Sequence, residues 1–289
     1  LDAKNNLQES HDDKLNAILN SATPLEKRRI KRSKTTGAWL TTLPNTLNGS
    51  DLSPDEFCDG VRLRLGLQPT ALPPRCDGCG ERFTTEHAMA CRKGGLIIQR
   101  HNDLVNTWGQ LCGQALTPST VTDEPLIQQS RDMPVAGTTQ TIPSPELRGD
   151  LAVHGFWTKG QTAIFDVRIT DTDQPTNRNT DPAKVLLRHE KEKKTKYGAL
   201  CIAKRRTFTP LVFSVDGLLG KEATAASKCL ASTLAGKWKR SYSEICGFVR
   251  SRLSIALVRS SSRCLCADRN PTQRFRNPTW DSGTGLGLY

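Results

Sequence analysis

A cluster of metal-binding residue types places the strongest constraint on how this chain folds. Residues 76–91 read CDGCGERFTTEHAMAC, which is a C-x2-C-x7-H-x3-C spacing. A glycine-rich turn between the first two cysteines lets both thiolates point inward. Three thiolates and one imidazole close a tetrahedron, the ligand set of a structural zinc ion with no open position for a reactive water. We therefore predict a structural Zn²⁺ bound by Cys76, Cys79, His87 and Cys91.

The sequence offers alternatives to this ligand set. His101 could replace His87, but His87 lies inside the compact spacing, whereas His101 begins a helix and would instead pack or bind phosphate. Ordinary buried cysteines are a further alternative, which the regular spacing disfavours. Cys264 and Cys266 form a separate pair without visible partners. We expect them to be free thiols at a fraying helix end.

The charge balance favours a polyanionic partner. Forty-one Lys and Arg against 29 Asp and Glu give a net charge of +12, and the isoelectric point is near 9.4. Nucleic acid is the first candidate and an anionic membrane surface the weaker one. No apolar run is long enough to span a bilayer, and no signal segment is visible, so the ten cysteines fit a reducing compartment. The chain starts at Leu1, as a piece cut from a larger protein would.

Basic residues follow the last zinc ligand. Arg92 and Lys93 come directly after Cys91, and Arg100 lies a few residues further on. A loop tied by zinc would hold this charge in a fixed place. We therefore expect these residues, together with His101, to contact nucleic acid.

The chain divides into four expected regions. They are a basic helical arm or linker (1–36), a helical lead-in with the zinc cluster (37–98), an α/β domain (99–262) and a disordered tail (263–289). The arm ends in EKRRIKRSK at 26–34, which is a DNA contact, a localisation signal or a solvated face. Within the lead-in, Ser53, Pro54 and Glu56 are the start signal of a helix over 52–67.

The α/β domain is expected to contain a mixed sheet. Leu104, Trp108 and Leu111 recur at helical spacing and predict a helix over 99–116. The elements that follow are a strand (120–127), a mobile loop (128–147), strands (150–156 and 162–169), a helix (182–206), a strand (209–217) and two closing helices (221–238 and 243–261). The order helix, strand, strand, strand, helix, strand favours a mixed sheet flanked by helices.

Two aspartates on the central pair of predicted strands are candidate metal ligands. Asp150 opens one strand of the hairpin and Asp166 lies in the other, so their carboxylates can approach each other and bind Mg²⁺. The alternative is an unrelated pair of turn or edge-strand aspartates. Strand alternation puts Arg168 on the same face as Asp166. Arginine can hold a phosphate but does not readily lose a proton, so a lysine from elsewhere is needed to activate water.

The predicted helix at 182–206 offers such a lysine. Lys193 and Lys194 precede Tyr197 by four and three residues, so these side chains share a helix face, with Glu190 one turn earlier. A solvated basic helix is the simpler interpretation for most of the lysines. We expect one of Lys191, Lys193 and Lys194 to reach the site, and Lys194 is the first choice.

These motifs resemble the C-terminal region of polyproteins from site-specific non-LTR retrotransposons. In that family a Cys-Cys-His-Cys zinc knuckle precedes an R-H-N motif, here Arg100, His101 and Asn102, and then a restriction-like endonuclease of the PD-(D/E)XK class. The resemblance covers about residues 37–262 and implies a helix, three strands, a helix and a strand. It implies catalytic roles for Asp150, Asp166, Lys194 and Tyr197, with Lys193 as the neighbouring possibility and Glu124 as a weaker match to the first acid of the class.

The chain departs from the family pattern at two positions. Gly149 stands where the class name has proline, and Arg168 stands where it has lysine. The resemblance implies a nuclear, Mg²⁺-dependent endonuclease that nicks double-stranded target DNA and so primes an upstream reverse transcriptase of the same polyprotein. The alternatives are a non-enzymatic nucleic-acid-binding module whose nuclease has decayed, and an appendage of the polymerase that binds the element's own RNA.

Overall fold

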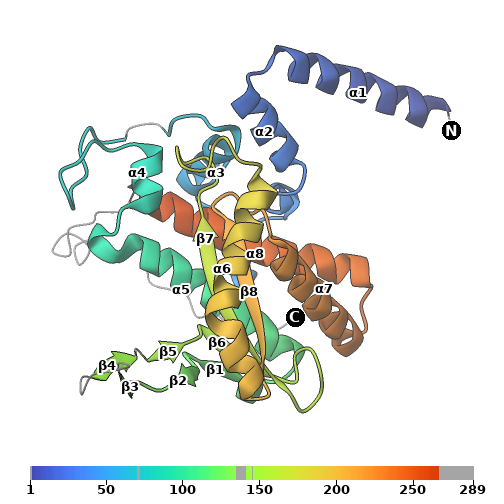
Figure 1. Cartoon of the computed structure of the whole chain (residues 1–289). Helices are drawn as coiled ribbons and strands as arrows, with labels where there is room; N and C mark the ends of the chain where they lie inside the picture. Colours follow the sequence, from blue (N-terminus) through green and yellow to red (C-terminus); the bar gives the residue numbers. More distant parts are fainter. Residues whose placement is uncertain (1, 70–71, 135–140, 145, 267–289) are drawn as a thin grey trace.

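A mixed four-stranded sheet forms the centre of the protein, as the sequence predicts (Figure 1). The computed structural model describes residues 2–69, 72–134, 141–144 and 146–266. The sheet has the order β1-β6-β7-β8, with strands at Val121–Asp123, Leu151–His154, Thr162–Thr170 and Thr207–Ser214. The first three strands pair antiparallel, whereas β7 and β8 pair parallel. The crossover between these parallel strands contains helix α6 (Pro182–Ala203).

Helices cover both faces of this sheet. On one face, Phe165 and Val167 of β7 pack in a core with Trp108 of α5 (Leu96–Ala115) and with α7 (Lys221–Trp238) and α8 (Tyr242–Cys266). On the other face, Ile164 packs with Tyr197 of α6. Successive residues of a strand point to opposite faces, so Asp166 and Arg168 lie on the side of α6. The predicted faces of β7 are confirmed.

Helix α8 is longer than the sequence predicts. It continues past the expected end at residue 261 to Cys266. Cys264 is fully buried against the backbone of Leu96, and the Sγ atom of Cys266 lies 3.2 Å from a carboxylate oxygen of Asp59 in α3 (Pro54–Leu65). The expectation of a fraying helix end is therefore wrong, because tertiary contacts hold its last turn. The rest of the predicted tail lies outside the described residues.

The predicted strand at 120–127 is divided between two sheets. Glu124 has a φ of +45° and Pro125 follows it, so the chain turns between β1 and β2 (Leu126–Gln128). Strand β2 pairs with β5 (Leu147–Arg148) outside the main sheet. The predicted loop at 128–147 also contains a strand pair, β3 (Arg131–Pro134) and β4 (Thr141–Ser144). The loop prediction is wrong for these strands, while residues 135–140 and 145 lie outside the described part of the chain.

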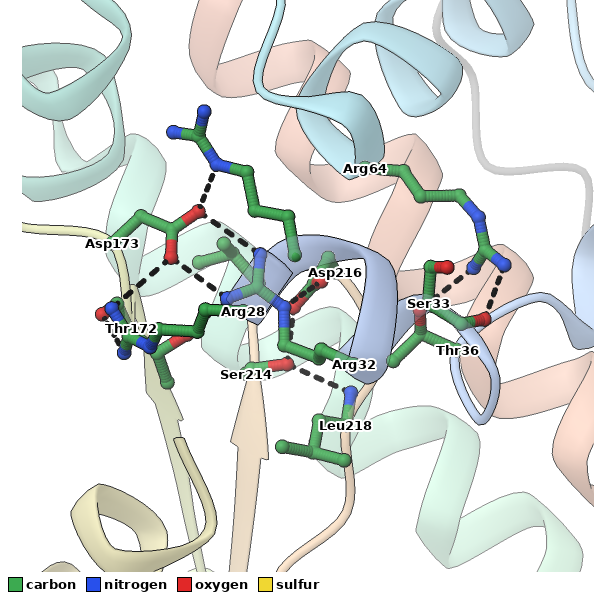
Figure 2. A network of polar contacts seen from close by, with 12 residues as sticks. Arg28, Arg32, Ser33, Thr36, Arg64, Thr172, Asp173, Ser214, Asp216 and Leu218 are labelled. Carbon is green, nitrogen blue, oxygen red and sulfur yellow. Dashed lines mark hydrogen bonds and ion pairs between the residues drawn. The ribbon is translucent and has the colours of Figure 1, made fainter. Parts of the chain in front are cut away.

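The N-terminal segment is helical and is attached to the α/β domain. Helix α1 (Asp2–Ser21) extends away from the rest of the protein, whereas α2 (Pro24–Ser33) packs against the α/β domain (Figure 1). The predicted basic run falls in α2. Arg32 is 6 % exposed and forms ion pairs with Asp173 (2.8 Å) and Asp216 (2.5 Å), as Figure 2 shows. Arg28 donates to the carbonyl oxygen of Thr172 at 2.6 Å.

This arginine network corrects the expectation of a free basic arm. Arg29 also pairs with Asp173, at 2.9 Å, so three arginines of α2 contact the segment that follows β7. Burial alone would raise the pKa of Asp173, but the hydrogen bonds and charges of Arg32 and Arg29 outweigh it and lower this pKa to about 2. These arginines are internal anchors, and within the run Lys31 and Lys34 remain exposed to solvent.

The remaining elements are two α-helices and short 3-10 turns. Helix α3 starts with the predicted capping box, in which Ser53 and Glu56 satisfy each other's backbone N–H groups. Helix α4 (Thr85–Ala90) lies within residues 76–91, the segment that carries the predicted zinc ligands. Single 3-10 turns lie at Ala38–Thr41, Thr46–Asn48, Lys93–Gly95 and Pro118–Thr120. In the described part of the chain, no helix is both long and apolar enough to cross a membrane.

Candidate zinc centre and acidic site

The four predicted zinc ligands come together through a tight turn and a short helix. The chain turns back on itself between Arg75 and Arg82, which form an antiparallel bridge, and the backbone N–H of Cys76 donates to the carbonyl of Glu81. Gly80 has a φ of +76°, a left-handed conformation that this turn requires. Thr84 caps the start of α4, which carries His87, and Cys91 is the residue directly after its end at Ala90. The ligand atoms of Cys76, Cys79, His87 and Cys91 all lie within 4.8 Å of one another.

The separations fit a tetrahedral zinc ion. The Sγ atoms of Cys76 and Cys91 are 3.9 Å apart, as are those of Cys79 and Cys91, and Nε2 of His87 lies 3.4 Å from Sγ of Cys79. A tetrahedron with the usual Zn–S and Zn–N bond lengths has S···S edges of about 3.8 Å and S···N edges of about 3.5 Å. The cluster therefore has the geometry of a closed, structural zinc site. His87, rather than His101, belongs to it.

The turn also favours a thiolate ligand. Burial raises the pKa of Cys76, but hydrogen bonds from His87 and from the backbone N–H groups of Gly78 and Cys79 outweigh this and lower the pKa to about 7. Zinc binds cysteine as the thiolate. Cys76 is therefore prepared to ligate a metal near neutral pH.

The basic residues beside this centre have different environments. Arg92 and Lys93 are exposed, and their contact with nucleic acid stays a prediction. Arg100 is 5 % exposed, and its guanidinium donates to the carbonyl oxygen of Met89 at 3.0 Å. The predicted nucleic-acid contact of Arg100 is therefore corrected, because its charge is used to attach α5 to α4.

The β6–β7 hairpin places Asp150 beside the part of β7 that carries Asp166. Asp150 directly precedes β6, and its backbone N–H donates to the carbonyl of Phe165 at 3.0 Å. Its Oδ2 atom accepts the N–H of Val167, so the Asp150 side chain lies beside the backbone that flanks Asp166. Asp166 is 4 % exposed. Burial raises the pKa of Asp166, and the charge of Asp150 adds to this effect while Lys193 opposes it.

Lys193, and not Lys194, reaches the acidic pair. Its Nζ atom lies 2.5 Å from Oδ2 of Asp166. That buried oxygen receives no well-aligned hydrogen bond, so the lysine is an ion-pair contact. Lys194 lies on another side of α6 and pairs with Glu222 of α7 at 2.6 Å. The first choice for the lysine is thus corrected in favour of the neighbouring possibility, while Lys191 is exposed.

Tyr197 of α6 is buried and packs against the ring of Phe208 of β8. It is 5 % exposed, and its ring lies 5.2 Å from that of Phe208, with the ammonium of Lys193 at 5.8 Å. The tyrosine therefore supports the lysine face of α6 by packing. Arg168, on the sheet face of Asp166, pairs with Glu192 at 2.8 Å. Its guanidinium is half-exposed and lies at the surface beside the acidic pair.

The side chain of Glu124 does not contact Asp150 or Asp166. Its backbone N–H donates to the carbonyl of Asp150 at 3.0 Å, but the residue is exposed, and no side-chain contact to the acidic pair is present among the described residues. The preceding helix instead supplies His101, whose Nε2 lies 3.1 Å from Oδ2 of Asp150. Burial lowers the pKa of His101, but Asp150 outweighs this and the pKa is raised. The sequence predicts that this residue packs or binds phosphate, and the contact with Asp150 was not predicted.

Packing and hydrogen bonding explain why residue 149 is a glycine. A Cβ atom on residue 149 would lie 2.6 Å from Cγ2 of Ile164, so even alanine would require the core to shift. The N–H of Gly149 also donates to the carbonyl of Pro125 at 3.0 Å, a bond that proline cannot make. A glycine at this position is therefore a local requirement of the segment that leads to Asp150.

The acidic pair is chemically suited to a magnesium ion. Mg²⁺ is usually held by one or two carboxylates and keeps waters or substrate phosphates as its other ligands. Asp150 and Asp166 provide these two carboxylates. Oδ2 of Asp166 contacts Lys193 and Oδ2 of Asp150 contacts Val167 and His101, so the two Oδ1 atoms, which make no hydrogen bond among the described residues, are the oxygens that would bind a cation. Among the described residues, the Cys-Cys-His-Cys cluster is the single group of three or more His, Cys, Asp or Glu side chains close enough together to bind one metal ion.

Comparisons with known proteins identify no family. No family model matches the chain, and no curated protein matches it. The fold and the two sites therefore stand on the sequence motifs and the geometry alone.

Proposed function

We propose that this chain is a divalent-metal-dependent endonuclease that nicks double-stranded DNA. The observation that carries the proposal is the contact of Lys193 with Asp166, on the hairpin that also holds Asp150. Two carboxylates and a lysine on a mixed sheet with helices on both faces are the chemical equipment of metal-assisted phosphodiester hydrolysis. The resemblance to non-LTR retrotransposon endonucleases points to the same reaction.

The side chains have distinct roles in this proposal. Asp150 and Asp166 hold the cation, which when bound supplies Lewis-acid stabilisation of the phosphate charge. Lys193 donates to the attacking water or to a phosphate oxygen, offsetting the negative charge that develops there. Arg168, half-exposed beside Asp166, binds a neighbouring phosphate once it leaves Glu192.

The wider setting follows from the same resemblance. The nick provides a 3′ hydroxyl for a reverse transcriptase located upstream in the same polyprotein, and the reaction takes place in the nucleus. The zinc centre has a structural role, holding Arg92 and Lys93 where they contact the DNA backbone. The net charge of +12 supports a polyanionic substrate.

A nicking assay tests the activity. Supercoiled plasmid is incubated with the zinc-loaded protein and Mg²⁺, and the open-circular product is measured for wild type, Asp150→Asn, Asp166→Asn and Asp123→Asn. Asp123 is an exposed aspartate of β1 and serves as the matched control. We expect nicking by wild type and by the control and a loss in the other two variants. Folded wild-type protein that leaves the plasmid supercoiled contradicts the proposal.

A nucleic-acid-binding module without activity is the second candidate. The ion pair of Arg168 with Glu192, at the strand position where the class carries lysine, favours it because that charge is already neutralised inside the protein. This candidate predicts salt-dependent DNA binding that is unchanged by Asp150→Asn. Filter binding of DNA and of RNA at several salt concentrations also tests the RNA-binding alternative, since an RNA appendage binds RNA more tightly at every concentration.

A further inference from the structure

The carboxylate of Asp150 is held through one of its two oxygens. Oδ2 accepts the backbone N–H of Val167 and also lies 3.1 Å from Nε2 of His101. Among the described residues, Oδ1 makes no hydrogen bond. Because Oδ2 is fixed by two contacts, the direction in which Oδ1 points is fixed as well.

His101 is itself held in place. Its Nδ1 atom lies 3.2 Å from the side-chain oxygen of Asn102, and its side chain is 31 % exposed. It projects from α5, whose neighbouring residue Arg100 is attached to the carbonyl of Met89. The imidazole therefore reaches Asp150 from a helix that has its own fixed contact with the zinc centre.

We infer that His101 is a positioning residue for Asp150, which holds Oδ2 so that Oδ1 faces the divalent cation. The inference rests on the proposed function, because it takes Asp150 as a cation ligand. Groups that hydrogen-bond a ligating side chain fix its orientation, and their loss typically lowers metal affinity about 10- to 100-fold. Val167 alone would still bind Oδ2 after loss of the imidazole, but a single bond leaves the carboxylate free to rotate about it.

This role differs from that of a helix-borne acid. A glutamate from α5 would add a third negative charge beside Asp150 and Asp166, whereas histidine donates a hydrogen bond to Asp150. Asp166 is already matched by Lys193. Each carboxylate thus has one partner from a helix: His101 of α5 hydrogen-bonds Asp150, and Lys193 of α6 forms an ion pair with Asp166.

Cation binding can be measured independently of nicking. Mn²⁺ is titrated into the zinc-loaded full chain by isothermal calorimetry, for wild type, His101→Leu, His101→Gln and His154→Leu. Glutamine retains an N–H donor at a similar reach, and His154 is an exposed histidine that contacts Thr162 at the far end of the hairpin. We expect His101→Leu to weaken Mn²⁺ binding about 10- to 100-fold, His101→Gln to restore most of it, and His154→Leu to match wild type.

The outcomes separate this inference from the proposed function. Asp150→Asn is titrated in parallel, with thermal unfolding of every variant as a check of folding. If Asp150→Asn binds Mn²⁺ as wild type does, the acidic site does not hold the cation and the proposed function fails. If Asp150→Asn loses binding while His101→Leu retains wild-type affinity, the positioning role is overturned and the nuclease proposal stands. Equal weakening by His101→Gln and His101→Leu would also overturn it, because the hydrogen bond would then not be the cause.

Discussion

Arg100 and His101 are neighbours in α5, yet they contact two different sites. Arg100 donates to the carbonyl of Met89 beside the zinc ligands, and His101 lies 3.1 Å from Oδ2 of Asp150. Adjacent helix positions differ in direction by about 100°, so one turn of helix serves both sites. The zinc centre is therefore mechanically connected to the acidic pair through a single rigid element.

Loss of the zinc site should release one metal ion and destabilise the region around it. We expect Cys79→Ser to reduce bound zinc from one per chain to near zero, because a hydroxyl does not replace the thiolate ligand. Metal content by mass spectrometry and proteolysis between residues 72 and 95 measure the effect. Cys58→Ser is the control, since Cys58 is an exposed free cysteine outside the cluster. Full zinc occupancy in Cys79→Ser would exclude this ligand set.

Substitution of the two adjacent lysines should separate their roles. We expect Lys193→Met to lower the nicking rate about 100- to 10,000-fold, the usual contribution of a positioned proton donor or acceptor. Lys194→Met should have a much smaller effect, because Lys194 pairs with Glu222 on α7 and not with Asp166. Single-turnover plasmid nicking at saturating Mg²⁺ measures both. Equal losses, or a larger loss for Lys194→Met, would contradict the assignment.

Local patterns predicted much of the fold and of the acidic pair. Helical spacing located α5 through Trp108, and strand alternation placed Asp166 opposite Phe165. The choice between Lys193 and Lys194 could not be made in this way, because both share a face with Tyr197. Only the packing of α6 on the sheet, which is a tertiary property, directs Lys193 to Asp166.

Long-range pairing explains the errors at the N-terminus. A run of basic residues has the same appearance in the sequence whether it is solvated or paired, and the partner of Arg32, Asp173, is far away in the chain. The contact between His101 and Asp150 was missed for the same reason.

The buried arginine of α2 should be important for stability. Arg32→Ala leaves Asp173 and Asp216 without their closest cation, and breaking a buried ion pair from one side costs about 3–5 kcal/mol. Urea unfolding of the full chain measures the loss. Lys31→Ala, one residue away and exposed, is expected to change the free energy of unfolding by no more than about 0.5 kcal/mol. Similar values for the two variants would show that α2 does not depend on this network.

The same network contains an aspartate whose ionisation opposes folding. Burial raises the pKa of Asp171 to about 6, and the nearby charges of Asp173 and Asp216 add to this, while the Asp173 backbone N–H and Arg32 act against it. Between about pH 4 and 6 the folded chain therefore binds a proton that the unfolded chain has already released. Stability from this group is present below pH 4 and is lost as the pH rises through 6.

Removing the Asp171 carboxylate should raise the free energy of unfolding at neutral pH and leave it unchanged at acidic pH. Asp171→Asn keeps the side-chain oxygen that accepts the N–H of Asp173 at 2.9 Å, so the local turn can persist. With a shift of roughly two pKa units, the variant should be more stable than wild type by about 2–3 kcal/mol at pH 7. The difference should vanish near pH 4, where the wild-type side chain is itself neutral in the folded state. Urea unfolding of both proteins at pH 7 and pH 4 tests this, and a variant that is destabilised at pH 7 but not at pH 4 would show that the attraction of the Asp171 charge to Arg32 outweighs the cost of its burial.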